Sequence, residues 1–294
     1  MTALSYEGVG VGGRDLSYNR KITNVATVPQ LSPFRYPGGK TWLVPQIRQW
    51  LAGLQFRPTL FVEPFAGGGI ASLIAVMEDW ADRALMCEID PDVASVWETI
   101  LTEPDWLVDR ILAFEITRQA VEALLSQEAC DRRERAFRTL VRNRTQRGGV
   151  MAPGASLMKM GENGKGIASR WYPETLAKRI RRIAQHRDRI TFVCGDGMEV
   201  IRRFSDLETA VMFVDPPYTA GGKRAGRRLY LHSDVDHELL FDLMAQIRGK
   251  FLMTYDAAVE VVNMARARGF AIDLVPMKNG HHETMMELLI TNPH

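Results

Sequence analysis

The chain has 294 residues, of which 46% are hydrophobic and 24% are charged, values near the average for globular proteins. This composition excludes a disordered, collagen-like or coiled-coil chain, and the length leaves room for one elaborated domain or two modest ones. The sequence has no apolar run of the roughly 18 residues that a membrane span requires. Its N-terminal stretch also lacks a basic flank followed by an apolar segment. We therefore expect a cytoplasmic protein with no membrane partner.

The near-neutral net charge of +2 conceals an uneven distribution along the chain. Residues 131–190 contain 16 Lys and Arg against 5 Asp and Glu, a local net charge of +11. The other 234 residues hold 21 basic against 30 acidic side chains, a net charge of −9. A concentrated positive field attracts polyanions. Nucleic acid is therefore the leading macromolecular partner, with a pair of solvated basic helices as the alternative.

The sequence gives no sign of a disulfide framework or a metal site. Its three cysteines are Cys87, Cys130 and Cys194. They stand far apart, without the C-x-x-C spacing of zinc sites and redox pairs. His281 and His282 beside Glu283 fit a solvated hairpin tip better than a metal site, because no spaced ligand set accompanies them. We expect reduced thiols and no bound metal.

Short apolar runs alternate with helical patterns over most of the chain. Residues 1–30 precede this pattern, and we interpret them as a flexible arm because they are polar and show no periodicity. Strands are predicted at residues 59–63, 84–87, 190–194, 210–214, 250–254, 270–275 and 284–291. Helices are predicted at residues 41–51, 70–80, 104–144, 173–186, 234–247 and 257–268, and a further helix begins at Pro91.

Seven strands with intervening helices predict an α/β fold with a mostly parallel sheet. The last two strands are joined by a loop that contains Asn279 and Gly280, a signal for a hairpin. Residues 103–188 interrupt the alternation with a helical and basic segment. The predicted organisation is therefore an arm (1–30), one domain built from residues 31–102 and 189–294, and an insertion (103–188).

A glycine-rich loop follows the first strand, in the sequence Glu63-Pro64-Phe65-Ala66-Gly67-Gly68-Gly69. Glycines between a strand and a helix allow a ligand to approach the backbone closely. Glu88 ends the next strand, where an acidic side chain accepts hydrogen bonds from ribose hydroxyls. The loop does not match G-x-G-x-x-G, which argues against NAD and FAD. The pattern favours a cofactor with a nucleoside but no pyrophosphate, of which S-adenosylmethionine is the commonest.

The strand at 210–214 runs directly into Asp215-Pro216-Pro217-Tyr218. Two prolines fix φ and remove N–H donors, which leaves a rigid loop with an acceptor carboxylate, carbonyl oxygens and an aromatic face. Such a loop is suited to a planar amine. A simple proline turn is the structural alternative, but an apolar strand that ends in this tetrapeptide is far rarer than an isolated pair of prolines.

Four motifs together resemble the Dam-like family of adenine-N6 DNA methyltransferases. They are Arg35 to Lys40 (RYPGGK), Phe61 to Gly69 (FVEPFAGGG), Cys87 to Asp90 (CEID) and Asp215 to Tyr218 (DPPY). Their order and rough spacing match the group in which the cofactor motifs precede the DNA-recognition insertion, and the resemblance covers about residues 33–291. It implies a Rossmann-like methyltransferase sheet as the catalytic domain, S-adenosylmethionine as the cofactor, and a target-recognition role for the helical insertion.

The resemblance also implies roles for individual residues. Glu63 to Gly69 would line the methionine end of the cofactor, Glu88 would hold its ribose, and Asp196 would lie near its adenine. The implied cofactor-binding set is Tyr36, Lys40, Glu63, Pro64, Phe65, Gly67, Gly69, Glu88, Asp196 and Asp215. The implied catalytic set is Asp215, Pro216 and Tyr218. The insertion does not align with a recognition domain of known specificity, so the target sequence stays open.

The chemistry of adenine agrees with the DPPY loop. The exocyclic N6 is a poor nucleophile because its lone pair is delocalised into the ring. Hydrogen bonds from N6–H to the Asp215 carboxylate and the Pro216 carbonyl would localise that pair, while Tyr218 stacks on the base. The base must leave the duplex to reach such a site. A cytosine-C5 mechanism is disfavoured, because none of the cysteines follows a proline.

Basic and aromatic side chains in and after the insertion are candidates for contact with duplex DNA. The predicted set is Arg142, Arg144, Arg170, Trp171, Arg227 and Tyr230. A solvated position on the surface is the alternative for each one. A cognate restriction endonuclease is a further candidate partner. For His237 a catalytic base is conceivable, but capping of a helix by Asp234 or Asp236 explains that segment more simply.

Three other functions are alternatives to this one. Gly39-Lys40-Thr41 ends like a P-loop, but the pattern requires a glycine where Phe34 stands. A methyltransferase acting on RNA or on N4 of cytosine would use the same amine chemistry with related tetrapeptides. A non-catalytic DNA-binding module would leave the glycine-rich loop and the DPPY loop unexplained.

Overall fold

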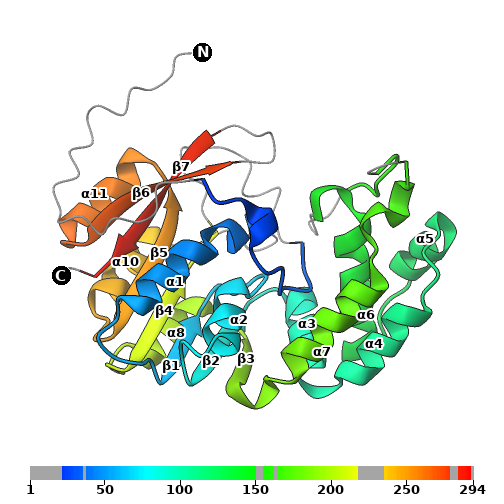
Figure 1. Cartoon of the computed structure of the whole chain (residues 1–294), viewed down its shortest axis with the longest axis horizontal. Coiled ribbons are helices and arrows are strands. Elements are labelled where there is room, and N and C mark those ends of the chain that lie inside the picture. Colours follow the sequence, from blue (N-terminus) through cyan, green and yellow to red (C-terminus); the bar gives the residue numbers. More distant parts are fainter. Residues whose placement is uncertain are drawn as a thin grey trace.

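The computed structural model describes residues 22–35, 38–149, 155–161, 164–217, 235–278 and 284–292. Its centre is a seven-stranded sheet with the order β3-β2-β1-β4-β5-β7-β6 (Figure 1). The strands are β1 Leu60–Glu63, β2 Arg83–Glu88, β3 Ile190–Cys194, β4 Ala210–Val214, β5 Lys250–Asp256, β6 Ala271–Lys278 and β7 Thr284–Thr291. β7 runs antiparallel to both of its neighbours, and the other pairings are parallel. All seven predicted strands are confirmed, and so is the predicted α/β fold with a mostly parallel sheet.

The central strands are apolar except at their ends, because helices cover both faces of the sheet. In β1, Phe61 contributes to the apolar core on one face, and Val62 to the core on the other. The first core includes helices α1 Val44–Ala52, α2 Ile70–Met77 and α3 Pro91–Thr102. The second includes α8 Gly197–Phe204, α10 His237–Ala245 and α11 Val259–Ala267. The described helices include none that is long and apolar enough to cross a membrane.

β6 is longer than the sequence predicts. The prediction ends at residue 275, just before Pro276. Proline cannot donate a hydrogen bond to a neighbouring strand. In the structure Pro276 lies opposite Met286, and the strand continues to Lys278. β6 is the last strand of the sheet, where proline is tolerated. The predicted turn at Asn279 and Gly280 lies outside the described residues.

The insertion is helical, as predicted, but its first part contains three helices where one continuous pattern was predicted. They are α4 Pro104–Ala113, α5 Arg118–Ser126 and α6 Arg132–Thr145, followed after the glycine-rich stretch by α7 Pro173–Ala184. Two side-chain caps explain the interruptions. The Thr117 hydroxyl accepts a hydrogen bond from Ala120 N (3.1 Å), and the Asp131 carboxylate accepts one from Glu134 N (2.9 Å).

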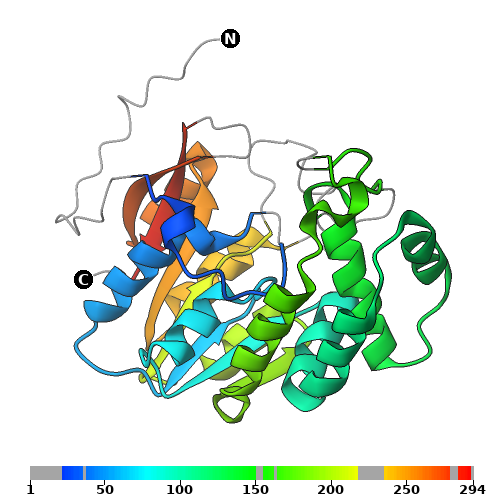
Figure 2. The same ribbon diagram turned by 45° about the vertical axis from the view of Figure 1, so that its right-hand side comes forward.

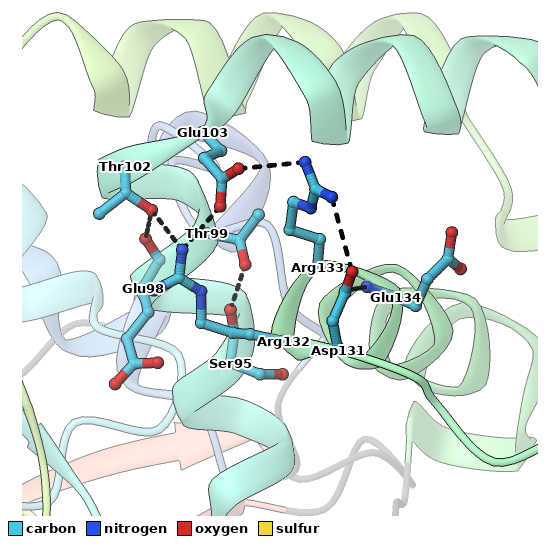
Figure 3. Close-up of polar contacts among 9 residues, drawn as sticks. All are labelled: Ser95, Glu98, Thr99, Thr102, Glu103, Asp131, Arg132, Arg133 and Glu134. Carbon is cyan, nitrogen blue, oxygen red and sulfur yellow. Dashed lines mark hydrogen bonds and ion pairs between the residues drawn. The ribbon is translucent and has the colours of Figure 1, made fainter.

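Ion pairs at the start of α6 tie it to the junction between α3 and α4 (Figure 3). The Arg132 guanidinium lies 2.7 Å from one oxygen of Glu103, and the Arg133 guanidinium lies 3.2 Å from the other. Arg133 also contacts Asp131 at 3.5 Å. Part of the positive charge that the sequence places in this region is therefore paired within the fold.

The apolar core on the α3 side continues from the sheet into the insertion without interruption. Phe61 of β1 and Trp97 of α3 belong to the same buried cluster as Phe137 of α6 and Ile180 of α7. In Figures 1 and 2 the green helices of the insertion stand beside the sheet at its α3 end. The described residues of the insertion therefore share one core with the sheet.

Replacement of Gly69 by alanine is expected to destabilise the protein by roughly 1–3 kcal/mol. Gly69 precedes α2 with a φ of 64°, and a Cβ atom there would lie 2.8 Å from Cζ2 of the buried Trp97. Thermal unfolding measures the loss. Gly53→Ala is the control, because Gly53 has an ordinary φ of −79° and its Cβ would find only van der Waals contacts. Equal melting temperatures for the two variants would contradict the prediction.

Candidate active site

Three acidic side chains meet at one edge of the sheet. Glu63 and Glu88 are the last residues of β1 and β2, and Asp215 directly follows β4. These three strands are adjacent and parallel, in the order β2-β1-β4, so their carboxyl ends lie side by side. Ligands of open α/β sheets bind at this edge. The structure therefore brings together the three acidic residues that the sequence assigns to separate motifs.

The Asp215 carboxylate is held from one side. Its Oδ1 accepts a hydrogen bond from the Thr254 hydroxyl (2.8 Å) and lies 2.9 Å from Lys40 Nζ. Among the described residues, Oδ2 has no partner, and the side chain is 22% exposed. The carboxylate thus has a fixed orientation with an oxygen left to accept a hydrogen bond from a ligand.

The Lys40 ammonium is buried between two carboxylates. Besides Asp215, it lies 3.1 Å from Oε1 of Glu287, and it donates a hydrogen bond to Gly38 O (3.2 Å). Glu287 lies on β7 and is buried as well. Lys40 was predicted to contact the cofactor, and in the structure its contacts are with the DPPY carboxylate and Glu287. Sequence reasoning missed Glu287 and Thr254, although a glutamate within an apolar alternating strand was a usable signal.

Glu63 is almost completely buried, with 3% of its surface exposed. Its Oε2 accepts a hydrogen bond from Ser72 N at the start of α2 (2.8 Å). Burial raises the pKa of this carboxyl group to about 8, against its hydrogen bonds with the helix. In the described part of the chain Glu63 forms no ion pair. A bound cation would therefore supply the counter-ion for its carboxylate.

The Glu88 carboxylate fixes the glycine-rich loop. It accepts hydrogen bonds from Gly67 N (2.9 Å), Ile89 N (2.9 Å) and Asp90 N (3.1 Å). The loop is also tied by Trp97 Nε1, which donates to Gly67 O (2.9 Å). Burial raises the pKa of Glu88. The loop and its acidic neighbour therefore form one rigid unit.

The loop after β3 lies against the loop after β1. A Cβ atom at Gly197 would stand 2.3 Å from Pro64 O and 2.9 Å from the Phe65 ring. Asp196 is exposed, and its carboxylate accepts a hydrogen bond from Met198 N (2.8 Å) as the cap of α8. The predicted cofactor-binding residues after β1, β2 and β3 thus line one continuous edge.

This edge fits a cationic cofactor that carries a nucleoside. A buried carboxyl group without an ion pair (Glu63) suits the ammonium and sulfonium charges of S-adenosylmethionine, and Glu88 retains acceptor capacity for ribose hydroxyls. The exposed Ile89 beside Glu88 offers an apolar surface to a base. Of the predicted cofactor and catalytic residues, Tyr36 and Tyr218 lie outside the described residues.

The predicted DNA-contacting side chains have different surroundings. Trp171 is buried, with 6% of its surface exposed, and packs edge-on against Phe114, which does not favour its predicted contact with DNA. The Arg142 guanidinium lies 2.8 Å from Asp92 and ties α6 to α3, so its contact with DNA stays a prediction. Arg144 is buried and Arg170 is half-buried. Arg227 and Tyr230 lie outside the described residues.

The helix cap proposed near His237 is confirmed for Asp236. Its carboxylate accepts a hydrogen bond from Leu239 N (3.0 Å) at the start of α10. His237 Nδ1 lies 2.9 Å from the hydroxyl of the buried Tyr255, and burial lowers the pKa of the imidazole. His237 lies on α10, and Tyr255 lies on β5, one residue after Thr254.

Comparison with known families identifies the reaction class. The model of the D12 class N6 adenine-specific DNA methyltransferase family matches residues 36–272. The chain belongs to this family. It is therefore a methyltransferase that uses S-adenosylmethionine, and the resemblance inferred from the four motifs is confirmed. The P-loop and non-catalytic alternatives are set aside.

Solved structures show only distant likeness. The rRNA methyltransferase AviRa from Streptomyces viridochromogenes is 13% identical with a TM-score of 0.40, over 87% of this chain and 86% of that one. The tRNA methyltransferase TrmK from B. subtilis is 12% identical with a TM-score of 0.36, over 84% and 64%. A precorrin-6y methyltransferase from Geobacter metallireducens is 10% identical with a TM-score of 0.36, over 83% and 85%. No curated protein sequence matches the chain.

Proposed function

We propose that this protein transfers a methyl group from S-adenosylmethionine to N6 of an adenine that is flipped out of duplex DNA at a specific sequence. The observation that carries the proposal is the Asp215 carboxylate. Thr254 and Lys40 hold one of its oxygens, and the other has no partner among the described residues. An oriented acceptor at the carboxyl end of β4 is what the amino group of a base requires.

Different residues of the chain have different roles in the proposed methyl transfer. The cofactor supplies an electrophilic methyl group on a sulfonium. Oδ2 of Asp215 and the Pro216 carbonyl accept hydrogen bonds from N6–H, which raises electron density at the nitrogen as it forms the new bond. The carboxylate is also placed to hold the proton that N6 releases after transfer. Lys40 and Thr254 keep it oriented throughout.

Duplex DNA is the proposed substrate because of the family and of the basic insertion beside the site. The residues from 131 to 190 carry a net charge of +11, only part of which is paired internally. An adenine stacked in a duplex cannot reach a carboxylate at the end of a buried strand, so the base must flip. A cognate restriction endonuclease is the partner against which such methylation would protect DNA.

Labelled methyl transfer tests the proposal directly. Incubation of the protein with methyl-labelled S-adenosylmethionine and unmethylated duplex DNA is expected to yield labelled N6-methyladenine on nucleoside analysis. One parallel reaction contains RNA in place of DNA. Another contains a duplex in which the amino groups of the other bases are already modified, so that only adenine can accept the label. Label in RNA alone, or N4-methylcytosine in place of N6-methyladenine, would contradict the proposed substrate.

A further inference from the structure

Glu287 is a buried glutamate within an apolar strand. It lies on β7, and only 2% of its surface is exposed. The alternation of the strand directs it to the same face of the sheet as Leu289, which belongs to the apolar core that contains Leu43. The residues opposite it are Asp256 on β5 and Val275 on β6, and neither of them is a cation. The cation that contacts Glu287 comes from outside the sheet.

That cation is the ammonium of Lys40. Lys40 begins a short 3₁₀ helix, Lys40–Leu43, and is itself only 5% exposed. Its Nζ lies 3.1 Å from Oε1 of Glu287 and 2.9 Å from Oδ1 of Asp215. One buried ammonium therefore contacts two carboxylates at nearly equal distances. Because charges interact more strongly in a poorly solvated interior than in water, both contacts affect how the charge of Lys40 is divided.

This division matters for the carboxylate that faces the substrate. During methyl transfer the positive charge of the sulfonium moves to the nitrogen that receives the methyl group. Negative charge beside that nitrogen therefore stabilises the transition state more than the reactants. If Lys40 contacted Asp215 alone, its ammonium would offset more of the charge that Asp215 presents at Oδ2. A second carboxylate on Lys40 leaves more of that charge available to the substrate.

We propose that Glu287 is a positioning residue for methyl transfer, which shares the Lys40 ammonium with Asp215 and so keeps the Asp215 carboxylate a strong acceptor for the amino group of the base. The inference rests on the proposed function and adds a residue to it. Glu287 acts through Lys40 and Asp215, so its role requires no contact with the base or the cofactor. The alternative is a structural role, in which Glu287 fills space in the core.

Two substitutions separate charge from shape at this position. Glu287→Gln keeps the shape and removes the charge, and Lys40 retains Asp215 as its counter-ion in the interior. We expect the single-turnover rate on duplex DNA to fall about 10-fold, with unchanged affinities for S-adenosylmethionine and DNA. Glu287→Asp keeps the charge and shortens the side chain, and it is expected to be faster than Glu287→Gln. A structural role predicts the opposite order, because glutamine fits the space better than aspartate.

A double-mutant cycle shows whether Glu287 acts through Lys40. In a Lys40→Met protein, the further change Glu287→Gln is expected to cause no additional loss of rate, because the connecting side chain is absent. An additional loss of about 10-fold would contradict the proposed connection. Thermal unfolding and binding of S-adenosylmethionine show which variants are folded. If Lys40→Met does not fold, the order of the two single variants of Glu287 decides the question.

The matched control is Glu260→Gln. Glu260 lies in the exposed first turn of α11, and its replacement removes one negative charge from the surface. The control is expected to keep the wild-type rate. A loss equal to that of Glu287→Gln would overturn the inference, because the loss of an acidic charge at any position would then suffice.

The outcomes separate this inference from the proposed function. If the wild type forms N6-methyladenine in duplex DNA and Glu287→Gln does so at the same rate, the role of Glu287 is refuted and the function stands. A rate for Glu287→Asp below that of Glu287→Gln also refutes the role, since shape would then decide. If the wild type methylates an amino group in RNA alone, the proposed substrate fails, and the order of the two variants on RNA decides the role of Glu287. If the wild type transfers no methyl group, both fail.

Discussion

Asp215→Asn is expected to slow methyl transfer by about 100-fold or more, while the protein stays folded. Asparagine keeps an oxygen for Lys40 and Thr254. It replaces Oδ2, which has no partner among the described residues, with an amide that donates hydrogen bonds. A donor facing N6–H opposes the interaction on which transfer depends. The ammonium of Lys40 keeps Glu287 at 3.1 Å as its counter-ion, so no unpaired charge is left in the interior. Single-turnover transfer of labelled methyl measures the rate.

Thr254→Val is the companion variant for this prediction. Valine keeps the shape of threonine and removes only the hydrogen bond to Oδ1 of Asp215. We expect a smaller loss, about 10-fold, because Lys40 still orients the carboxylate. An Asp215→Asn protein with normal melting temperature and a rate near that of the wild type would show that the carboxylate does not act on the substrate.

Glu63→Gln is expected to stabilise the cofactor-free protein at pH 8 and to weaken binding of S-adenosylmethionine. The pKa of Glu63 rises from 4.5 in the unfolded chain to about 8 in the fold, chiefly because the carboxyl group is buried. Between these values the unfolded chain loses a proton that the folded protein keeps. The wild type therefore loses stability as the pH rises from about 4.5 to 8, by on the order of 4 kcal/mol in total.

Urea unfolding at pH 5 and at pH 8, without cofactor, measures this difference. The advantage of Glu63→Gln over the wild type should grow between the two pH values. The control is Glu78→Gln. Burial acts to raise the pKa of Glu78, but the hydrogen bonds from Arg48 and Trp80 together outweigh it and lower the pKa. The effect of Glu78→Gln on stability should be the same at pH 5 and pH 8, because both pH values lie above the pKa of Glu78 in the folded and in the unfolded chain. A parallel change in both variants would contradict the assignment to Glu63.

Binding of the cofactor should reverse the sign of the Glu63 effect. A cation beside the carboxyl group favours its ionised form, so the wild type is expected to release a proton when S-adenosylmethionine binds near neutral pH. Calorimetry in buffers of different ionisation enthalpy detects that proton. Glu63→Gln should bind the cofactor more weakly and release none.

The strands and the acidic residues at their ends were predictable from local sequence. Each parallel strand is a short apolar run, and the chemistry follows at its carboxyl end, as in Val214 and Asp215. Because β2, β1 and β4 are adjacent and parallel, their carboxyl ends lie at the same edge of the sheet. Glu287 was not predictable in its role, because its position beside Lys40 depends on the register of the antiparallel β7.

The insertion was predicted less well than the sheet. Trp171 was assigned to DNA because Arg170 and Tyr172 flank it, yet neighbours in sequence on a turn point in different directions, and the indole packs inward. The interruptions of the helical pattern depend on single capping residues such as Thr117 and Asp131. The hydrogen bond from Arg179 to Ser32 O joins residues that are 147 positions apart. No local pattern reports such a contact.

The continuous core between sheet and insertion limits how the proposed recognition of DNA can change. A domain with its own core can be exchanged or remodelled while the rest of a protein keeps its stability. Here Phe137 and Ile180 of the insertion are buried in one cluster with Phe61 and Trp97. A substitution on the inner face of α6 or α7 therefore destabilises the catalytic sheet as well as the insertion. New target sequences are consequently most accessible through residues on the outer surfaces and loops of the insertion.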